Sequence, residues 1–113
     1  MSNGCKESDW RLFRKRLPGW QEAYMDRLTK EYVAILMGEG LASDRFWALE
    51  KRIRADKRKA GVIVTDVRRS VLTSTMAQLL REGAITEDDL DGFSDELRES
   101  LHYSMQVHRM LNA

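Results

Sequence analysis

The sequence is poor in cysteine, proline and long apolar runs. Its single cysteine, Cys5, cannot form an internal disulfide or a multi-cysteine zinc site, so we expect a reducing compartment, the cytoplasm. The longest uninterrupted apolar run, residues 32–37, is far shorter than the roughly 20 residues that span a bilayer. The first residues lack the apolar segment of a signal peptide. These absences predict a protein that is neither secreted nor membrane-spanning.

Charge is abundant in the sequence, and it is distributed unevenly. The 113 residues are 42% apolar and 33% charged, which is typical of a single soluble globular domain. The net charge is +1, but residues 1–69 hold 16 basic and 10 acidic residues, whereas residues 70–113 hold 3 basic and 8 acidic ones. This asymmetry favours packing of the chain against itself or against a second copy. The alternative is that each part faces a different partner.

Apolar residues recur at helical spacing along most of the chain, and no stretch alternates at the spacing of a strand. Residues 9–17 predict a short helix that ends at Pro18, because the residue before a proline avoids the helical conformation. Residues 19–37 predict a second helix, ended by Gly38 and Gly40, and residues 44–59 predict a third. We expect residues 1–8 to be a flexible N-terminus and residues 9–113 to be a single helical domain.

The most apolar helix is predicted over residues 62–80, in the centre of the sequence. Arg68 projects into its apolar stripe. In the preceding helix Glu50 points between Phe46 and Ile53, which form a narrow apolar face with Leu49. A buried charge needs a partner, so we predict an ion pair between Arg68 and Glu50, with Glu31 as the alternative partner. Such a pair would fix how the two helices pack.

The last part of the chain predicts two more helical segments. Thr86 and Asp89 have the spacing of a capping box and start a single turn. Ser94 is a suitable N-cap for a helix over residues 95–111, whose first turns are acidic, as the helix dipole favours. Together the segments predict an all-α fold, a compact bundle of four main helices plus one or two short ones.

Two acidic patterns have spacings found in metal sites, and neither fits. With Gly92 at the sixth place of a calcium loop, the twelfth place, which requires a bidentate glutamate, is Arg98. Glu99 and His102 have the spacing of di-iron ligands but lie away from the apolar stripe, whereas such ligands point inward. No serine or cysteine has an evident partner for nucleophilic chemistry. We therefore expect no metal, no cofactor and no catalytic residue.

Two charged faces are candidates for binding. The basic face combines side chains that can neutralise phosphates with an indole that can stack on a base; it consists of Trp47, Lys51, Arg54 and Arg58. The acidic face spans the single turn and the start of the last helix; it consists of Glu87, Asp88, Asp89, Asp91, Asp95, Glu96 and Glu99. The alternative for the basic face is a core tryptophan beside solvated basic residues that meet the acidic face.

Five short segments between residues 11 and 102 form a recognisable pattern. They are LFR (12–14), PGWQE (18–22), SDRFWALEKRI (43–53), IT with DDL (85–90) and FSDEL (93–97). In these segments the chain resembles a group of small uncharacterised proteins of Gram-positive bacteria, often carried on mobile elements. Some members bear the automatic label "multidrug transporter", which conflicts with the absence of a membrane span. The resemblance implies no established activity, and the stretch 102–113 is longer than expected for the group.

These observations predict a small cytoplasmic protein that binds protein, has no catalytic activity and self-associates as a homodimer. The alternative is an accessory regulator from a mobile element that inhibits a nuclease or nucleoprotein, as an anti-CRISPR protein does, with the acidic face imitating phosphate charge. A second alternative is weak nucleic-acid binding through the basic face. We expect no interaction with membranes.

Overall fold

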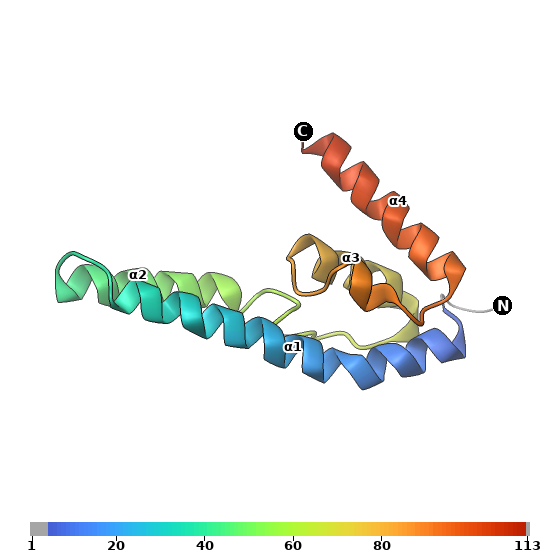
Figure 1. Cartoon of the computed structure of the whole chain (residues 1–113), viewed down its shortest axis with the longest axis horizontal. Coiled ribbons are helices and arrows are strands. Elements are labelled where there is room, and N and C mark those ends of the chain that lie inside the picture. Colours follow the sequence, from blue (N-terminus) through green and yellow to red (C-terminus); the bar gives the residue numbers. More distant parts are fainter. Residues whose placement is uncertain (1–4, 113) are drawn as a thin grey trace.

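The computed structural model describes residues 5–112, which form four α-helices, two short 3₁₀ helices and no strand. The helices are α1 (Glu7–Leu36), α2 (Ala42–Asp56), α3 (Leu72–Arg81) and α4 (Asp95–Leu111), with η1 (Arg69–Val71) before α3 and η2 (Glu87–Leu90) before α4. The predicted all-α fold of four main helices and short additional ones is confirmed. Figure 1 shows α1 running the length of the molecule and α2 folding back along its second half.

α1 is a single helix of 30 residues, where two helices were expected. Its apolar side continues across Pro18, because Phe13, Leu17, Trp20 and Tyr24 follow one another at helical spacing and all are buried. A proline inside a helix costs roughly 3 kcal/mol, since it lacks an N–H and crowds the preceding turn. Burial of the continuous apolar side offsets this cost, so the prediction that Pro18 ends a helix was wrong.

The N-terminus also differs from the expectation of a flexible segment over residues 1–8. Glu7 and Ser8 already belong to α1. Residues 1–4 lie outside the described residues, so the expectation for them stays a prediction.

The hydrophobic core lies between the first half of α1, α3, η2 and the start of α4. A row of aromatic rings crosses it, formed by Trp10, Phe13, Trp20 and Phe93, with neighbouring ring centroids 6.0–6.3 Å apart. Aliphatic side chains from the later helices complete the core, among them Leu72, Met76, Leu79, Leu97 and Leu101. The core thus joins the beginning of the chain to its end.

Residues 57–68 form a loop, so the helix predicted over residues 62–80 exists only in its second part, as η1 and α3. All residues from 62 to 67 except Asp66 are β-branched, and such side chains lose rotamer freedom in a helix. The loop is held against α1 instead. Gln21 donates a hydrogen bond to the carbonyl of Ala60 at 3.0 Å, and Gly61 lies directly on the ring of Tyr24.

The second half of α1 and all of α2 form an antiparallel hairpin that projects from the core, and we call residues 22–56 the helical arm (Figure 1). At its tip Arg45 donates a hydrogen bond to the carbonyl of Leu36 at 3.0 Å, which satisfies the end of α1. The radius of gyration is 16.7 Å and the longest axis 58 Å. A rounded domain of this length would have a radius of gyration of about 13 Å. The helical arm and the outer part of α4, which both project from the core, account for the difference.

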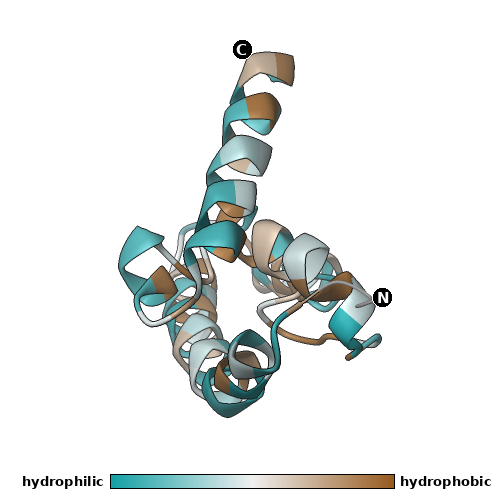
Figure 2. Cartoon of the chain, turned by 90° about the vertical axis from the view of Figure 1, so that its right-hand side faces the viewer, coloured by the Kyte–Doolittle hydropathy of each residue, from teal (hydrophilic) through white to brown (hydrophobic). Residues whose placement is uncertain are grey.

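α4 starts in the core and ends away from it, as Figure 2 shows. Leu97 and Leu101 are buried, whereas Met110 and Leu111 near the C-terminus are exposed. The helix spans residues 95–111 as predicted, and the backbone N–H of Leu97 donates to Ser94 Oγ at 3.3 Å. The predicted cap at Thr86 is also present, since its N–H donates to Asp89 Oδ2 at 2.8 Å.

Candidate functional site

The basic face lies on the helical arm. Trp47, Lys51 and Arg54 share one side of α2, and Arg58 follows just after the helix ends. The side chain of Trp47 is 62% exposed, so the alternative of a core tryptophan is wrong. Its ring meets the ring of Phe46 edge-on, with centroids 4.9 Å apart. The four residues of the basic face are therefore presented to solvent together.

The neighbouring side of α2 is apolar and is not covered by another element. α2 buries one side chain, that of Asp56, while Phe46 is 60% and Ile53 37% exposed. A hollow of about 310 Å³ lies on this side; it is lined by Phe46, Leu49, Glu50, Ile53, Arg54 and Lys57. A helix of a soluble domain normally turns its apolar stripe to the core. This stripe of α2 therefore lacks its covering surface.

A second hollow, of about 160 Å³, lies between the two helices of the arm. It is lined by Met25, Leu28, Thr29, Tyr32, Ile53, Asp56, Lys57 and Val62. Ile53 and Lys57 line both hollows, which therefore adjoin. We call the two hollows together the apolar furrow. It runs along one side of the helical arm from Phe46 to the loop at Val62.

A polar cluster around Asp56 holds the two helices of the arm together. Asp56 is 2% exposed, and its Oδ2 accepts hydrogen bonds from the Tyr32 hydroxyl at 2.7 Å and from Arg52 Nε at 2.9 Å. Lys59 Nζ lies 3.2 Å from its Oδ1. Arg52 also pairs with Glu31 of α1 and lies over the Tyr32 ring, 5.8 Å from the centroid. The cluster ties α1 to α2 at a fixed separation.

The pKa values in this cluster are shifted, and the causes can be named. Burial opposes ionisation of Asp56, but hydrogen bonds from Tyr32 and Lys59 and the charge of Arg52 outweigh it and hold the pKa of Asp56 below its usual value. Burial and the hydrogen bond to the Asp56 carboxylate raise the pKa of Tyr32 to about 12. The cluster is therefore a charged carboxylate held by a neutral phenol and two cations.

The predicted ion pair between Arg68 and Glu50 is absent, so this prediction was wrong. Arg68 lies in the loop before α3, is exposed, and donates from Nε and Nη2 to the two carboxylate oxygens of Asp66, each at 2.6 Å. Glu50 accepts from Arg54 Nε at 3.0 Å on its own helix. Glu31, the alternative partner, pairs with Arg52. The prediction failed because it assumed a helix through Arg68, which the β-branched stretch prevents.

The acidic face lies far from the basic face, because α2 and the start of α4 are at opposite ends of the long axis (Figure 1). Three of the seven carboxylates of the acidic face are already paired. Glu87 contacts His102 Nε2 at 2.5 Å, Glu96 contacts Lys6 Nζ at 2.6 Å, and Asp95 contacts Arg98 at 3.1 Å. Within residues 5–112 the carboxylates of Asp88, Asp89, Asp91 and Glu99 form no ion pair. Intrachain pairing thus lowers the free negative charge of this face.

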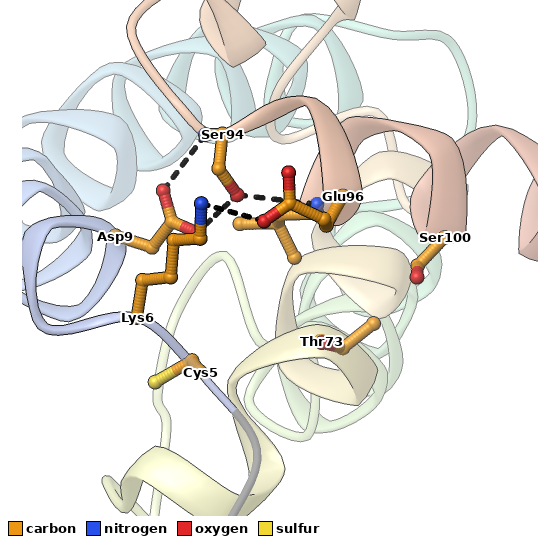
Figure 3. A pocket seen from close by; sticks show the side chains of 8 residues that line it. Cys5, Lys6, Asp9, Thr73, Ser94, Glu96 and Ser100 are labelled. Atoms are coloured by element: carbon orange, nitrogen blue, oxygen red, sulfur yellow. Dashed lines mark hydrogen bonds and ion pairs between the residues drawn. The ribbon is translucent and has the colours of Figure 1, made fainter. Parts of the chain in front are cut away.

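A polar hollow of about 360 Å³ lies where the first turn of α1 meets the start of α4 (Figure 3). Asp9, in the first turn of α1, accepts hydrogen bonds from the Ser94 N–H at 2.8 Å and the Ser94 hydroxyl at 2.6 Å. Cys5 lines the hollow, and burial raises the pKa of its thiol, which favours the less reactive protonated form. Asp9 with Ser94 and Lys6 with Glu96 form pairs that join the start of α1 to the start of α4, so we assign this hollow a structural role.

The described residues contain no group of three or more His, Cys, Asp or Glu side chains that could hold a metal ion. His102, from the pattern with di-iron spacing, contacts Glu87 instead of facing the core.

Asp56, the acid on which the geometry of the arm depends, was not predicted from the sequence. A signal was present, because Arg52 and Lys59 lie at helical ion-pair spacing before and after it. Its burial had no such signal, since that depends on Tyr32 of a different helix. The apolar furrow was missed for a similar reason: Phe46, Leu49 and Ile53 were recognised as apolar, but their pattern does not show whether the chain itself covers them.

Comparisons with known proteins add no further information on the site. No protein-family model, no curated protein and no solved structure matches this chain. None of the helices in the described part of the chain has the length and hydropathy to cross a bilayer.

Proposed function

We infer that this chain is a small protein-binding module without catalytic activity, and that the apolar furrow of the helical arm is its binding site. One observation carries the inference: α2 presents Phe46 and Ile53 to solvent while its only buried side chain is a carboxylate. Exposed apolar side chains that adjoin on one surface and have a charged rim are typical of protein interfaces. The single cysteine supports a cytoplasmic location as part of this proposal.

A photo-crosslinking amino acid in place of Phe46, in the full chain and in its native cell, tests this function. The expected result is a covalent adduct with a defined protein, identified by mass spectrometry, that disappears when Ile53→Asp is added. The matched control places the same crosslinker at Lys30, which lies on the arm but away from the furrow. The absence of any protein adduct at position 46 would overturn the proposal.

The exposure of Trp47 favours a second candidate function, binding of single-stranded nucleic acid through the basic face. Lys51 and Arg58 form no ion pair within residues 5–112, so both are available to phosphates. Binding of this kind weakens steeply as salt rises, because cations are released from the nucleic acid. Fluorescence titration of a labelled oligonucleotide at low and at moderate salt tests it, with Trp47→Ala as the variant. No binding at low salt would rule this candidate out.

The regulator of a nuclease or nucleoprotein, with an acidic face that imitates phosphates, is the less supported proposal. Three of the seven carboxylates of the acidic face, those of Glu96, Asp95 and Glu87, are already paired with Lys6, Arg98 and His102, which lowers the charge available to imitate phosphates.

A further inference from the structure

We propose that the apolar furrow is covered by the same surface of a second copy of this chain, with the two α2 helices antiparallel and Glu50 of each subunit against Lys57 of the other. This inference rests on the proposed function, because it names the partner of that site.

The stripe of α2 that borders the furrow consists of Phe46, Glu50, Ile53 and Lys57. These residues follow at spacings of four, three and four, so they form one line along the helix. At 1.5 Å per residue the line is about 16 Å long. Along this line the acid Glu50 precedes Ile53 and the base Lys57 follows it, and the aromatic Phe46 lies at one end. Two copies of this line that run in opposite directions therefore have complementary charges.

Reversal about a twofold axis beside Ile53 brings opposite charges together. Glu50 lies three residues before Ile53 and Lys57 four residues after it, so in an antiparallel pair each Glu50 lies opposite Lys57 of the other subunit. The symmetry forms this contact twice. A parallel pair would instead place Glu50 beside Glu50 and Lys57 beside Lys57, which like charges disfavour. Lys57 has no ion pair among the described residues, so it is available for this contact.

The same twofold axis places Phe46 of one subunit near the second hollow of the other. Phe46 lies seven residues before Ile53, about 11 Å along α2. The 160 Å³ hollow between α1 and α2 is lined by Ile53, Lys57 and Val62, so it extends beyond Ile53 in the direction in which the reversed helix carries Phe46 of the other subunit. Phe46 of each subunit therefore enters the second hollow of the other. The surface thus supplies both the side chain that inserts and the hollow that receives it.

The helical arm is already ordered for this association. The cluster of Asp56, Tyr32 and Arg52 fixes α2 on α1 within one subunit, so dimerisation does not have to order the hairpin. Trp47, Lys51 and Arg58 of the basic face lie about a quarter turn or more from the stripe, whereas Arg54 borders the first hollow, so Lys51 stays outside the contact. Two hairpins packed in this way form an antiparallel four-helix bundle across the subunits.

Analytical ultracentrifugation of the full chain and of charge-exchanged variants tests the proposal. The wild type is expected to be a dimer. Glu50→Lys alone and Lys57→Glu alone should each raise the dissociation constant by about tenfold, because each replaces attraction by repulsion at two sites. The double variant should return it to within about threefold of the wild type, because the exchanged charges attract again. Lys51→Glu, on the other side of α2, is the matched control and should leave the constant unchanged.

Ile53→Asp and Phe46→Asp should give folded monomers, since both side chains are partly exposed in one subunit and circular dichroism can confirm that each variant keeps its helices. A dimer in which the two charge reversals do not compensate each other would overturn the antiparallel arrangement. A wild type that is monomeric at every concentration tested would overturn the second copy as partner. If the wild type is monomeric but a crosslinker at position 46 captures another protein, the proposed function stands and only the second copy as partner is overturned. If no protein is captured either, the proposed function and the proposed dimer are both overturned.

Discussion

At the scale of single residues, Asp56 has the strongest expected effect on the helical arm. It is the only buried side chain of α2, and it binds Tyr32, Arg52 and Lys59. Asp56→Asn keeps the shape but removes the charge that the two cations neutralise. We expect a loss of about 1–3 kcal/mol in the free energy of unfolding at neutral pH, measured by urea denaturation.

The pH dependence of Asp56→Asn follows from the lowered pKa of Asp56. A carboxyl group with a lower pKa in the folded state adds stability above the unfolded value of 3.8 and loses it as the pH falls through the folded value. The difference between the wild type and Asp56→Asn should therefore shrink as the pH falls below about 4. Asp26→Asn, at an exposed pair with Lys30, is the control and should change little. A constant difference across this range would contradict the assigned role.

Two glycines form a matched pair for a second test. A Cβ at Gly61 would lie 2.3 Å from the ring of Tyr24, whereas a Cβ at Gly19 would meet nothing within 4 Å. Gly61→Ala should therefore destabilise the protein by about 1–3 kcal/mol, since the ring or the loop has to move. Gly19→Ala, within α1, should stabilise it by about 0.5–1 kcal/mol. Thermal unfolding measures both, and equal effects would show that the loop does not pack closely on α1.

At the scale of helices and loops, α1 shows how packing overrides a local signal. Pro18 is exposed, so its replacement removes no core contact. Pro18→Ala restores a backbone donor within the helix and should stabilise the protein by about 1–3 kcal/mol in urea denaturation. Glu22→Ala, also exposed on α1, should stay within about 0.5 kcal/mol of the wild type. A loss of stability in Pro18→Ala would mean that Leu17 and Trp20 pack well only with the proline present.

The sequence predicted the existence of the helices better than their continuity. α4 has its predicted bounds, and the caps at Thr86 and Ser94 are where local chemistry placed them, because capping depends on neighbouring residues only. The prediction that Pro18 ends a helix was wrong because burial of a continuous apolar side of α1 outweighs the cost of the proline. The prediction that Arg68 lies within a helix was wrong because apolar periodicity was given more weight than the low helix propensity of the β-branched residues before it. The basic face was identified as a set, but the apolar furrow was not, since an uncovered stripe and a covered one have the same pattern.

At the scale of the whole molecule, stability is expected to differ between the arm and the core. α3 buries four side chains in the core, whereas α2 buries one. Local opening should therefore need less free energy in α2 than in α3. Hydrogen–deuterium exchange on dilute protein should show faster exchange in residues 42–56 than in residues 72–81. Exchange in α2 should slow as the concentration rises if a second copy covers the furrow, and exchange in α3 serves as the internal control. Equal protection of α2 and α3 at high dilution would contradict this expectation.

The contact between Asp9 and Ser94 has a consequence for the order in which the chain folds as it leaves the ribosome. These residues are 85 positions apart, whereas Tyr32 and Asp56 in the arm are 24 apart. Contacts between close positions form first, because the chain between them is short. The arm can therefore close while the residues that cover Trp10 and Phe13 are still being synthesised. Until Ser94 has emerged, the aromatic side of α1 is the surface that a chaperone at the ribosome would meet.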